Sequence, residues 1–129
     1  MVPNGHDGGN QYMQDQSISK LADKLREFAE ERDWGQFHSP KNLAMALTVE
    51  TAELLEEFQW LTEQHSREPD QEHLERIKEE IGDVMIYLVR LSDQLGIDPL
   101  MSAFKKIEKN RTKYPVDKTK GSAKKYTDL

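Results

Sequence analysis

The feature that most limits how this 129-residue chain can fold is a repeated apolar spacing of three and four residues, in segments separated by helix breakers. This spacing puts apolar side chains on one face of an α-helix. It predicts four helices, at about residues 17–32, 40–64, 70–95 and 99–111. No segment has a convincing strand pattern, so we predict an all-α fold, a bundle of four to five helices.

The predicted helix starts carry local signals. Ser39–Pro40 and Asp98–Pro99 each place a capping side chain before a proline, whose missing N–H costs nothing at the first helical position. Asp70 is a similar cap for the third helix, and Gly96 is a plausible stop.

Composition divides the chain into three parts. Residues 1–16 are rich in Gly, Asn, Asp and Gln, and we expect a flexible leader there. Residues 17–114 hold the helical periodicity and form the predicted domain. Residues 115–129 contain four lysines and no helical periodicity, which indicates a C-terminal tail whose lysines either add solubility or contact phosphate.

Charge and cysteine content exclude several classes of protein. The formal net charge is −6, which argues against binding nucleic acid or an anionic membrane through bulk electrostatics. The chain has no cysteine, so disulfides and zinc–thiolate sites are excluded. This is compatible with a reducing cytosol, and a cytoplasmic location is our expectation. No apolar run is long enough for a membrane span. With 36% apolar residues, a monomer would have a modest core, and oligomerisation would bury more.

The second predicted helix carries carboxylates among its apolar side chains. At the helical period, Glu50 lies within the leucine stripe and Glu53 on its flank. Glu57 also falls within the stripe, whereas Glu56 points away. An ionised carboxylate that faces a core is costly unless it is paired or bound to a metal. The geometry therefore separates Glu50, Glu53 and, less firmly, Glu57 from ordinary surface acids.

The third predicted helix repeats the pattern. Glu80 and Asp83 lie one turn apart in a mostly apolar segment, and Tyr87 follows a turn later on the same face. Gly82 is a poor helix former in mid-helix and leaves room for a neighbouring helix or a ligand. This second acidic pair would face the first if the two helices are antiparallel neighbours.

One acidic pair alone says little, because 24 of the 129 residues are Asp or Glu and solvated helix faces are common. Two pairs on facing helices supply four oxygen donors, which suit a hard cation such as Mg²⁺ or Mn²⁺. A di-iron bundle would instead need Glu-x-x-His, and no histidine here has Glu three residues before it. Solvated faces and a cation site remain the two interpretations of the spacing.

The order Glu50-x-x-Glu53, then Glu80-x-x-Asp83, resembles the paired acidic motif of the MazG-like all-α NTP pyrophosphohydrolases. The segments "EFAEERDWGQFHSPKNLAMAL", "LLEEFQW", "EEIGDVMIYLVRL", "KNRTKYP" and "GSAKKYTDL" are similar to the dCTP pyrophosphatase branch. Glu57 is an acid that the motif does not require. The stretch before Glu27 matches less well, so no base contact is transferred from the first helix.

The resemblance implies a Mg²⁺-dependent enzyme, with Mn²⁺ able to substitute, that cleaves a nucleoside triphosphate between its α and β phosphates in nucleotide-pool sanitation. Glu50, Glu53, Glu80 and Asp83 would hold the metal, and Glu53 or Glu50 would orient or deprotonate the attacking water. A homotetramer built as a dimer of dimers is expected from the resemblance and from the apolar third helix. The implied contacts to base, sugar and phosphate are Trp34, His38, Lys41, Asn42, Trp60, Tyr87, Asn110, Lys113 and Tyr114.

The sequence leaves other interpretations open. Trp34 and Trp60 could be core or hinge aromatics, and His38 could satisfy a backbone group. A broad-specificity (d)NTP pyrophosphohydrolase is the alternative within the same class. A non-catalytic helical nucleotide sensor or scaffold is the alternative from a different class, and it would not need all four carboxylates to face inward.

Overall fold

The computed structural model describes residues 17–129, and all regular structure in that range is helical. The described part up to Gly96 and residues 97–129 form two compact units. The elements in chain order are α2 (Ile18–Glu31), η1 (Gly35–Phe37), α3 (Pro40–Glu56), α4 (Glu63–Arg67), α5 (Gln71–Gln94), α6 (Pro99–Lys113), α7 (Val116–Thr119) and η2 (Tyr126–Asp128). The predicted all-α class is confirmed, and the predicted leader, residues 1–16, lies outside the described residues.

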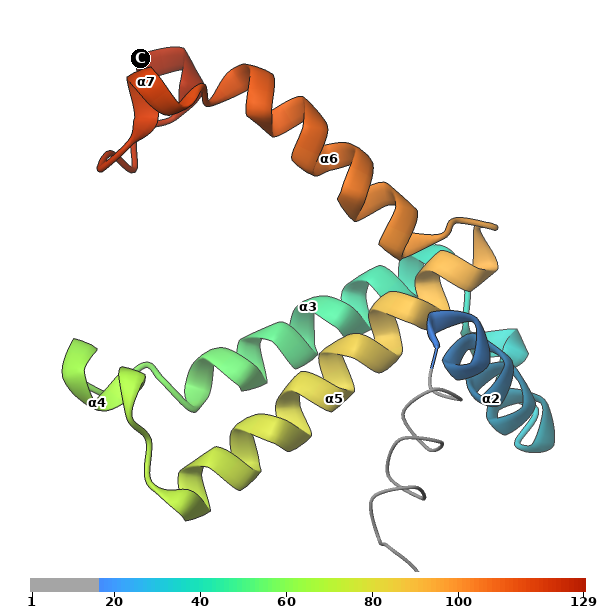
Figure 1. Cartoon of the computed structure of the whole chain (residues 1–129). Helices are drawn as coiled ribbons and strands as arrows, with labels where there is room; N and C mark the ends of the chain where they lie inside the picture. The colour runs from blue at the N-terminus through green and yellow to red at the C-terminus, as the bar shows by residue number, and fades with distance from the viewer. Residues whose placement is uncertain (1–16) are drawn as a thin grey trace, which may run out of the picture. The chain divides into compact units, whose positions relative to one another are not determined.

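In the first unit, α3 and α5 run antiparallel side by side, and α2 packs against α5 (Figure 1). The antiparallel pairing follows from the short connection through α4, which returns the chain along the helix it has just left. The pairing brings the acidic segments of α3 and α5 to the same level. This pair of helices therefore positions the candidate site.

The predicted helix starts are confirmed. The Ser39 hydroxyl accepts a hydrogen bond from the backbone N–H of Asn42, and the Asp70 carboxylate accepts one from that of His73. The Asp98 carboxylate accepts from the N–H groups of the first turn of α6. Each side chain satisfies a donor that would otherwise have no partner inside the helix.

The predicted end of the second helix is wrong. It was placed at about Gln64, but α3 ends at Glu56, and the separate helix α4 begins after a Thr62 cap. The physical reason lies in α5: the backbone carbonyl of Glu57 is bound by the His73 ring, and the Glu57 carboxylate lies 3.3 Å from Arg76 Nε. These contacts stabilise a turn where the sequence has neither glycine nor proline.

The second unit also differs from expectation. α6 continues two residues beyond the predicted end at Arg111, to Lys113. The tail, whose sequence shows no helical periodicity, contains α7 and η2. Thr119 stabilises the first of these turns by donating its hydroxyl to the Pro115 carbonyl at 2.6 Å. The division at residue 114 into domain and tail stays a prediction.

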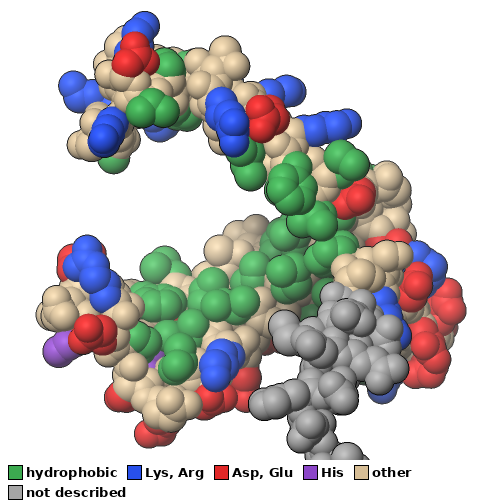
Figure 2. All heavy atoms as spheres, viewed as in Figure 1, with side chains coloured by type: hydrophobic (Ala, Val, Ile, Leu, Met, Phe, Trp, Pro, Cys, Tyr) green, Lys and Arg blue, Asp and Glu red, His purple; other side chains and the backbone are tan. Residues whose placement is uncertain are grey.

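The core of the first unit is small, and many apolar side chains remain exposed. Ala29, Leu43, Ile77 and Val89 are buried. Hydrophobic side chains also gather on the surface over α3 and α5 (Figure 2), among them Met45, Val49, Leu55, Ile81, Met85 and Leu88. In the range that the structure describes, no helix is both long and apolar enough to cross a membrane.

Candidate active site

Four carboxylates meet between the two long helices. Glu50 and Glu53 project from α3, and Glu80 and Asp83 project from α5. One ligand oxygen from each residue lies within 4.8 Å of the others. The i, i+3 spacing in each helix places both acids of a pair on one face, and the antiparallel packing then brings the two faces together. The arrangement offers a compact set of oxygen donors from two rigid elements.

The cluster is electrostatically unbalanced. One carboxylate oxygen of Glu50 and one of Glu80 are buried without a hydrogen-bond partner among the described residues. Burial, reinforced by Glu53, Asp83 and Glu80, raises the pKa of Glu50 to about 7. Burial and the neighbouring carboxylates also raise the pKa of Glu80 above its usual range. Orphaned buried oxygens of this kind need an explanation, and a cation between the helices would satisfy them.

The other residues of these acidic segments have different environments. Glu57, which helical spacing placed near the cluster, pairs with His73 and Arg76 of α5. Glu56 is exposed, as the spacing predicted. Apart from the two chain neighbours of Gly82 and the nearby backbone of α5 itself, no described atom lies within 4 Å of the place where a Cβ on Gly82 would stand. Glu57 therefore has its own partners on α5, among them the Arg76 guanidinium, and Gly82 borders open space within the described chain.

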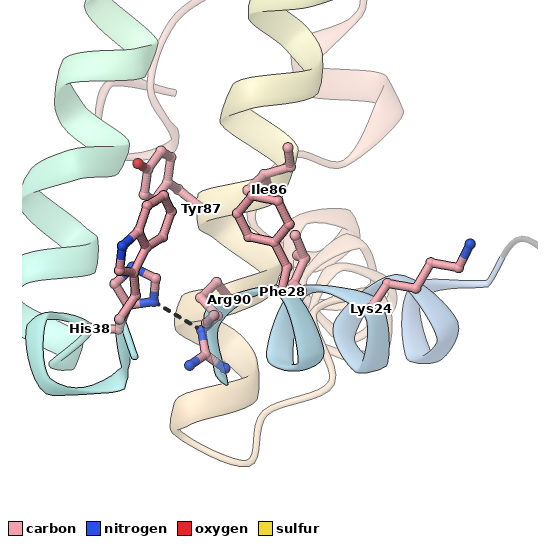
Figure 3. Close-up of a pocket in the computed structure, with 9 residues that line it drawn as sticks. Lys24, Phe28, His38, Ile86, Tyr87 and Arg90 are labelled. Carbon is pink, nitrogen blue, oxygen red and sulfur yellow. Dashed lines mark hydrogen bonds between the residues drawn. The ribbon is translucent and has the colours of Figure 1, made fainter. Parts of the chain in front are cut away.

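A mostly apolar cavity of about 250 Å³ lies near the start of α3. It is lined from α2, from the connection between α2 and α3, and from α5 by Lys24, Leu25, Phe28, Ala29, Trp34, His38, Ile86, Tyr87 and Arg90. Phe28 and Ile86 lie across from His38 and Tyr87, while the Lys24 side chain extends away from the aromatic group (Figure 3). Tyr87 is one helical turn beyond Asp83, so α5 connects the acidic cluster to the cavity wall.

The aromatic side chains of this cavity pack edge to face. The ring centroids of Phe28 and Trp34 are 5.6 Å apart, and those of Trp34 and His38 are 6.1 Å apart. Edge-to-face contacts suit the charge distribution of aromatic rings and stabilise their orientation. The cavity therefore has a defined aromatic wall of a size that suits a planar heterocycle.

Charged residues behind the cavity are paired with one another. Arg90 Nε donates to His38 Nδ1 at 3.2 Å, and Arg90 also lies 3.5 Å from the Asp93 carboxylate. Arg26 holds the same carboxylate with two hydrogen bonds, of 2.7 and 3.1 Å. These bonds from Arg26 lower the pKa of Asp93, whereas burial and then Arg90 lower that of His38. Asp23 lies 3.5 Å from Arg26, so two carboxylates face the two arginines, and this region balances its own charges, unlike the acidic cluster.

The structure brings Trp34, His38 and Tyr87 together but places Trp60 elsewhere. Trp60 follows the end of α3, whereas Trp34 and His38 precede its start, and α3 has 17 residues. A helix of that length rises about 25 Å at about 1.5 Å per residue. Trp60 is also 88% exposed. Within one chain, the two tryptophans therefore do not flank a common cavity.

The remaining predicted contacts have local partners or are exposed. Lys41 is exposed in the first turn of α3, and the Asn42 side chain donates to the Phe37 carbonyl at 3.0 Å. This hydrogen bond links the end of η1 to the first turn of α3. The roles of Asn42 and Lys41 in ligand binding stay predictions.

Three further predicted contacts lie in the second unit. The Lys113 ammonium group is 4.7 Å from the Tyr126 ring centroid, and Tyr114 packs edge to face against the same ring. The backbone carbonyl of Asn110 accepts a hydrogen bond from the Tyr114 N–H. These contacts explain the local fold of the tail, and the functional roles of Asn110, Lys113 and Tyr114 stay predictions.

Sequence reasoning missed Phe28, Ile86 and Arg90 as cavity residues. Phe28 and Ile86 belong to apolar helical stripes, where a core position and a ligand contact give the same pattern. Arg90 could have been found, because it is a basic residue in the apolar run from Val84 to Leu91. A charged side chain in such a run is rarely buried without a partner.

The sequence matches the MazG-like family over residues 45–129. That match spans more than half of the chain and includes both acidic pairs. The chain belongs to the MazG-like family, so the resemblance seen in its motifs is confirmed.

Individual relatives support the same assignment. The chain is 46% identical to dCTP pyrophosphatase 1 of Rattus norvegicus and 43% identical to that of Homo sapiens, each over 105 residues. These matches cover 80% of this chain but 62% of each relative. The crystal structure of a pyrophosphatase from Archaeoglobus fulgidus is similar, with a TM-score of 0.72 and 43% identity, covering 76% of this chain and 92% of that one.

Proposed function

We propose that this protein is a divalent-metal-dependent hydrolase that cleaves dCTP or a related nucleoside triphosphate into the monophosphate and pyrophosphate. The observation that carries the proposal is the cluster of Glu50, Glu53, Glu80 and Asp83, whose ligand oxygens lie within 4.8 Å of one another. Similarity to proteins named dCTP pyrophosphatase 1 supports the choice of substrate. The role that follows is sanitation of the nucleotide pool.

The donor set fits a hard divalent cation. All four donors are carboxylates, which suit Mg²⁺ and Mn²⁺ better than softer metals. The unpaired buried oxygens of Glu50 and Glu80 are the atoms that most need a cation. Glu50, Glu53, Glu80 and Asp83 would hold it, and when bound it supplies neutralisation of phosphate charge and a water of lowered pKa.

The residues of the chain would then have separate roles in binding and in catalysis. The four carboxylates would hold the cation at the junction of α3 and α5, and its positive charge would offset the repulsion between this acidic protein and the triphosphate. Glu53 or Glu50 orients the attacking water or takes its proton. Attack in line on the α-phosphorus breaks the bond to the bridging oxygen, and pyrophosphate leaves with that oxygen.

The base would occupy the aromatic cavity one turn along α5 from Asp83. Trp34 supplies a face for stacking, and His38 and Tyr87 supply polar edges. Asn110, Lys113 and Tyr114 are assigned to sugar or phosphate contacts, together with Lys41 and Asn42. Binding and chemistry thus use neighbouring but separate groups.

We further propose a homo-oligomer in which a second copy supplies Trp60. Trp60 is 88% exposed and lies at the far end of α3 from Trp34. Apolar side chains exposed over α3 and α5, such as Val49 and Ile81, need a covering surface. A homotetramer built as a dimer of dimers would supply both Trp60 from a second copy and a surface that covers the apolar side chains. The family resemblance favours four subunits. The substrate class favours a cytoplasmic location.

A nucleotide panel tests the proposed activity. The protein is incubated with each common (d)NTP and Mg²⁺, and phosphate is measured by malachite green with and without added inorganic pyrophosphatase. We expect phosphate only in the coupled arm, most for dCTP, and none in EDTA. Similar rates for all bases would favour a broad-specificity enzyme. Phosphate in the uncoupled arm would refute α–β cleavage, and no turnover at all would favour a sensor or scaffold.

A further inference from the structure

Arg90 is a buried cation in direct contact with the cavity histidine. The residue is 6% exposed, although it carries a full charge. Its Nε–H donates to His38 Nδ1 at 3.2 Å across 52 residues of sequence (Figure 3). A buried guanidinium is costly unless it is anchored, so its position calls for a structural or functional explanation.

The contact determines the protonation of His38. Arginine has only hydrogen-bond donors, so the nitrogen that faces it has to be unprotonated. A neutral imidazole carries one ring proton, which then lies on Nε2. Within residues 17–129, no group accepts a hydrogen bond from that nitrogen. His38 therefore offers the cavity it lines one N–H donor.

The surrounding charges keep this arrangement in place. Asp93 lies 3.5 Å from Arg90 and is itself held by Arg26 through two hydrogen bonds. Among the described residues, the other ionised side chain on the cavity wall is Lys24, also a cation, and none of the lining residues is a carboxylate. Burial and then Arg90 lower the pKa of His38, so the imidazole is neutral near pH 7.

We propose that Arg90 is a positioning residue that holds His38 as the Nε2–H tautomer, and that this donor selects the base. The selected base has an unprotonated ring nitrogen, as cytosine has at N3. Thymine and uracil carry an N–H there, and two facing donors would both lose their hydrogen bonds. The inference rests on the proposed function, because it assumes that the cavity holds the base of a nucleotide.

The tautomer can be measured without any nucleotide. Long-range ¹H–¹⁵N correlation spectra of the full-length protein should show His38 protonated at Nε2 alone. Arg90→Gln should give a mixture of tautomers, because an amide can either donate to Nδ1 or accept from it. Arg26→Gln removes the same charge at the outer end of the network and should keep the Nε2–H form. A wild-type His38 protonated at Nδ1, or at both nitrogens at pH 7.5, would overturn the inference.

Base selection is measured as the ratio of kcat/KM for dCTP over dTTP. In Arg90→Gln the ratio should fall roughly ten- to a hundredfold, the value of one mismatched buried hydrogen bond. The change should come mainly from a lower KM for dTTP, because His38 can now accept from its N–H. Arg26→Gln should keep the wild-type ratio. An unchanged ratio in Arg90→Gln, with His38 released from a single tautomer, would refute base selection by this contact.

A second variant covers the case in which Arg90→Gln does not fold. His38→Gln puts an amide at the cavity wall that can present either its N–H or its oxygen. The ratio of kcat/KM for dCTP over dTTP should therefore fall as it does in Arg90→Gln. A wild-type ratio in His38→Gln would overturn the assignment. Inactivity of the wild-type protein towards every nucleotide would overturn the proposed function and base selection together, whereas the NMR measurement would still decide the tautomer.

Discussion

Helix α5 carries two pairs of charged residues with the same spacing and opposite electrostatics. Glu80 and Asp83 are three residues apart and face two further carboxylates from α3. Arg90 and Asp93 are also three residues apart, but they carry opposite charges, and Arg26 binds the same Asp93 carboxylate. The carboxylate cluster around Glu80 has no compensating cation among the described residues. The charges around Arg90 compensate one another.

The difference separates a site for an external ion from a structural network. Burying charge is unfavourable unless an opposite charge or hydrogen bonds compensate for it. Near Arg90 the chain supplies that compensation itself, and the network orients a cavity wall. Between Glu50 and Glu80 the described residues supply none, and the proposed cation would provide it. Uncompensated charge, rather than charge as such, is thus the basis for placing the proposed chemistry at this cluster.

The largest effect is expected from removing charge at the uncompensated cluster. Glu53→Gln and Asp83→Asn keep side-chain shape but each remove one anionic ligand. Turnover at saturating Mg²⁺ should fall on the order of 10²–10³-fold, the range for loss of one electrostatic stabiliser of a transition state. Melting temperature in EDTA should hold or rise, because repulsion among the carboxylates decreases.

Glu56→Gln is the matched control, because Glu56 lies one turn from Glu53 on the exposed side of α3. Its turnover should stay close to wild type. Near-wild-type turnover in Asp83→Asn under the same conditions would remove Asp83 from the site and weaken the contrast between the two regions of α5.

The next largest effect concerns the aromatic side of the site. Base stacking is worth about 1–3 kcal/mol. Trp34→Ala and Trp60→Ala should therefore each raise KM for dCTP roughly ten- to a hundredfold, with a much smaller change in kcat than in Asp83→Asn. Steady-state kinetics over a range of dCTP concentrations gives both parameters.

Mixed assemblies show whether Trp60 acts on a second copy. Co-expression of Trp34→Ala and Trp60→Ala chains should regenerate some sites with both tryptophans, each from a different subunit. A fraction of the activity should then recover the wild-type KM. No recovery in an assembly whose mixed composition is verified by mass spectrometry would argue against a shared site, and a monomeric mass in light scattering would refute the oligomer.

A smaller effect is expected in the pH dependence of stability without metal. The pKa of Glu50 is raised to about 7 from its usual 4.5, so the folded protein holds this proton where the unfolded chain has lost it. The associated stability is full below about pH 4.5 and is lost as pH rises to about 7. Melting temperature in EDTA should fall by several degrees over that window.

Glu50→Gln supplies the control for this prediction, because it lacks the titrating group and should have a flatter profile between pH 5 and 7. Excess Mg²⁺ should also flatten the wild-type profile by stabilising the ionised form. A wild-type profile in EDTA that matches that of Glu50→Gln would show that this carboxyl does not carry the effect.

The smallest effect is expected at the outer end of the compensated network. Arg26 is half exposed, and Asp93 keeps Arg90 as a partner when Arg26 is replaced. Arg26→Gln should therefore lower the free energy of unfolding by about 1 kcal/mol or less, the usual value of an exposed ion pair. Urea unfolding measures it, and a loss several times larger would mean that this network is more than a local anchor.

The local features of this protein could be predicted from its residues alone. Ser39, Asp70 and Asp98 predicted the helix starts, because a capping side chain acts on backbone groups within the next three residues. The two acidic pairs followed from the helical period, which decides which side chains share a face. The four carboxylates of the cluster were therefore predictable once α3 and α5 were taken to be antiparallel.

Other features depend on contacts between residues that are far apart in the sequence. α3 ends at Glu56 because His73, 16 residues beyond Glu57, binds its carbonyl. The tautomer of His38 depends on Arg90, 52 residues away. Propensity and periodicity act over a turn or two of helix, whereas these contacts depend on how helices cross and on which buried polar groups find partners there.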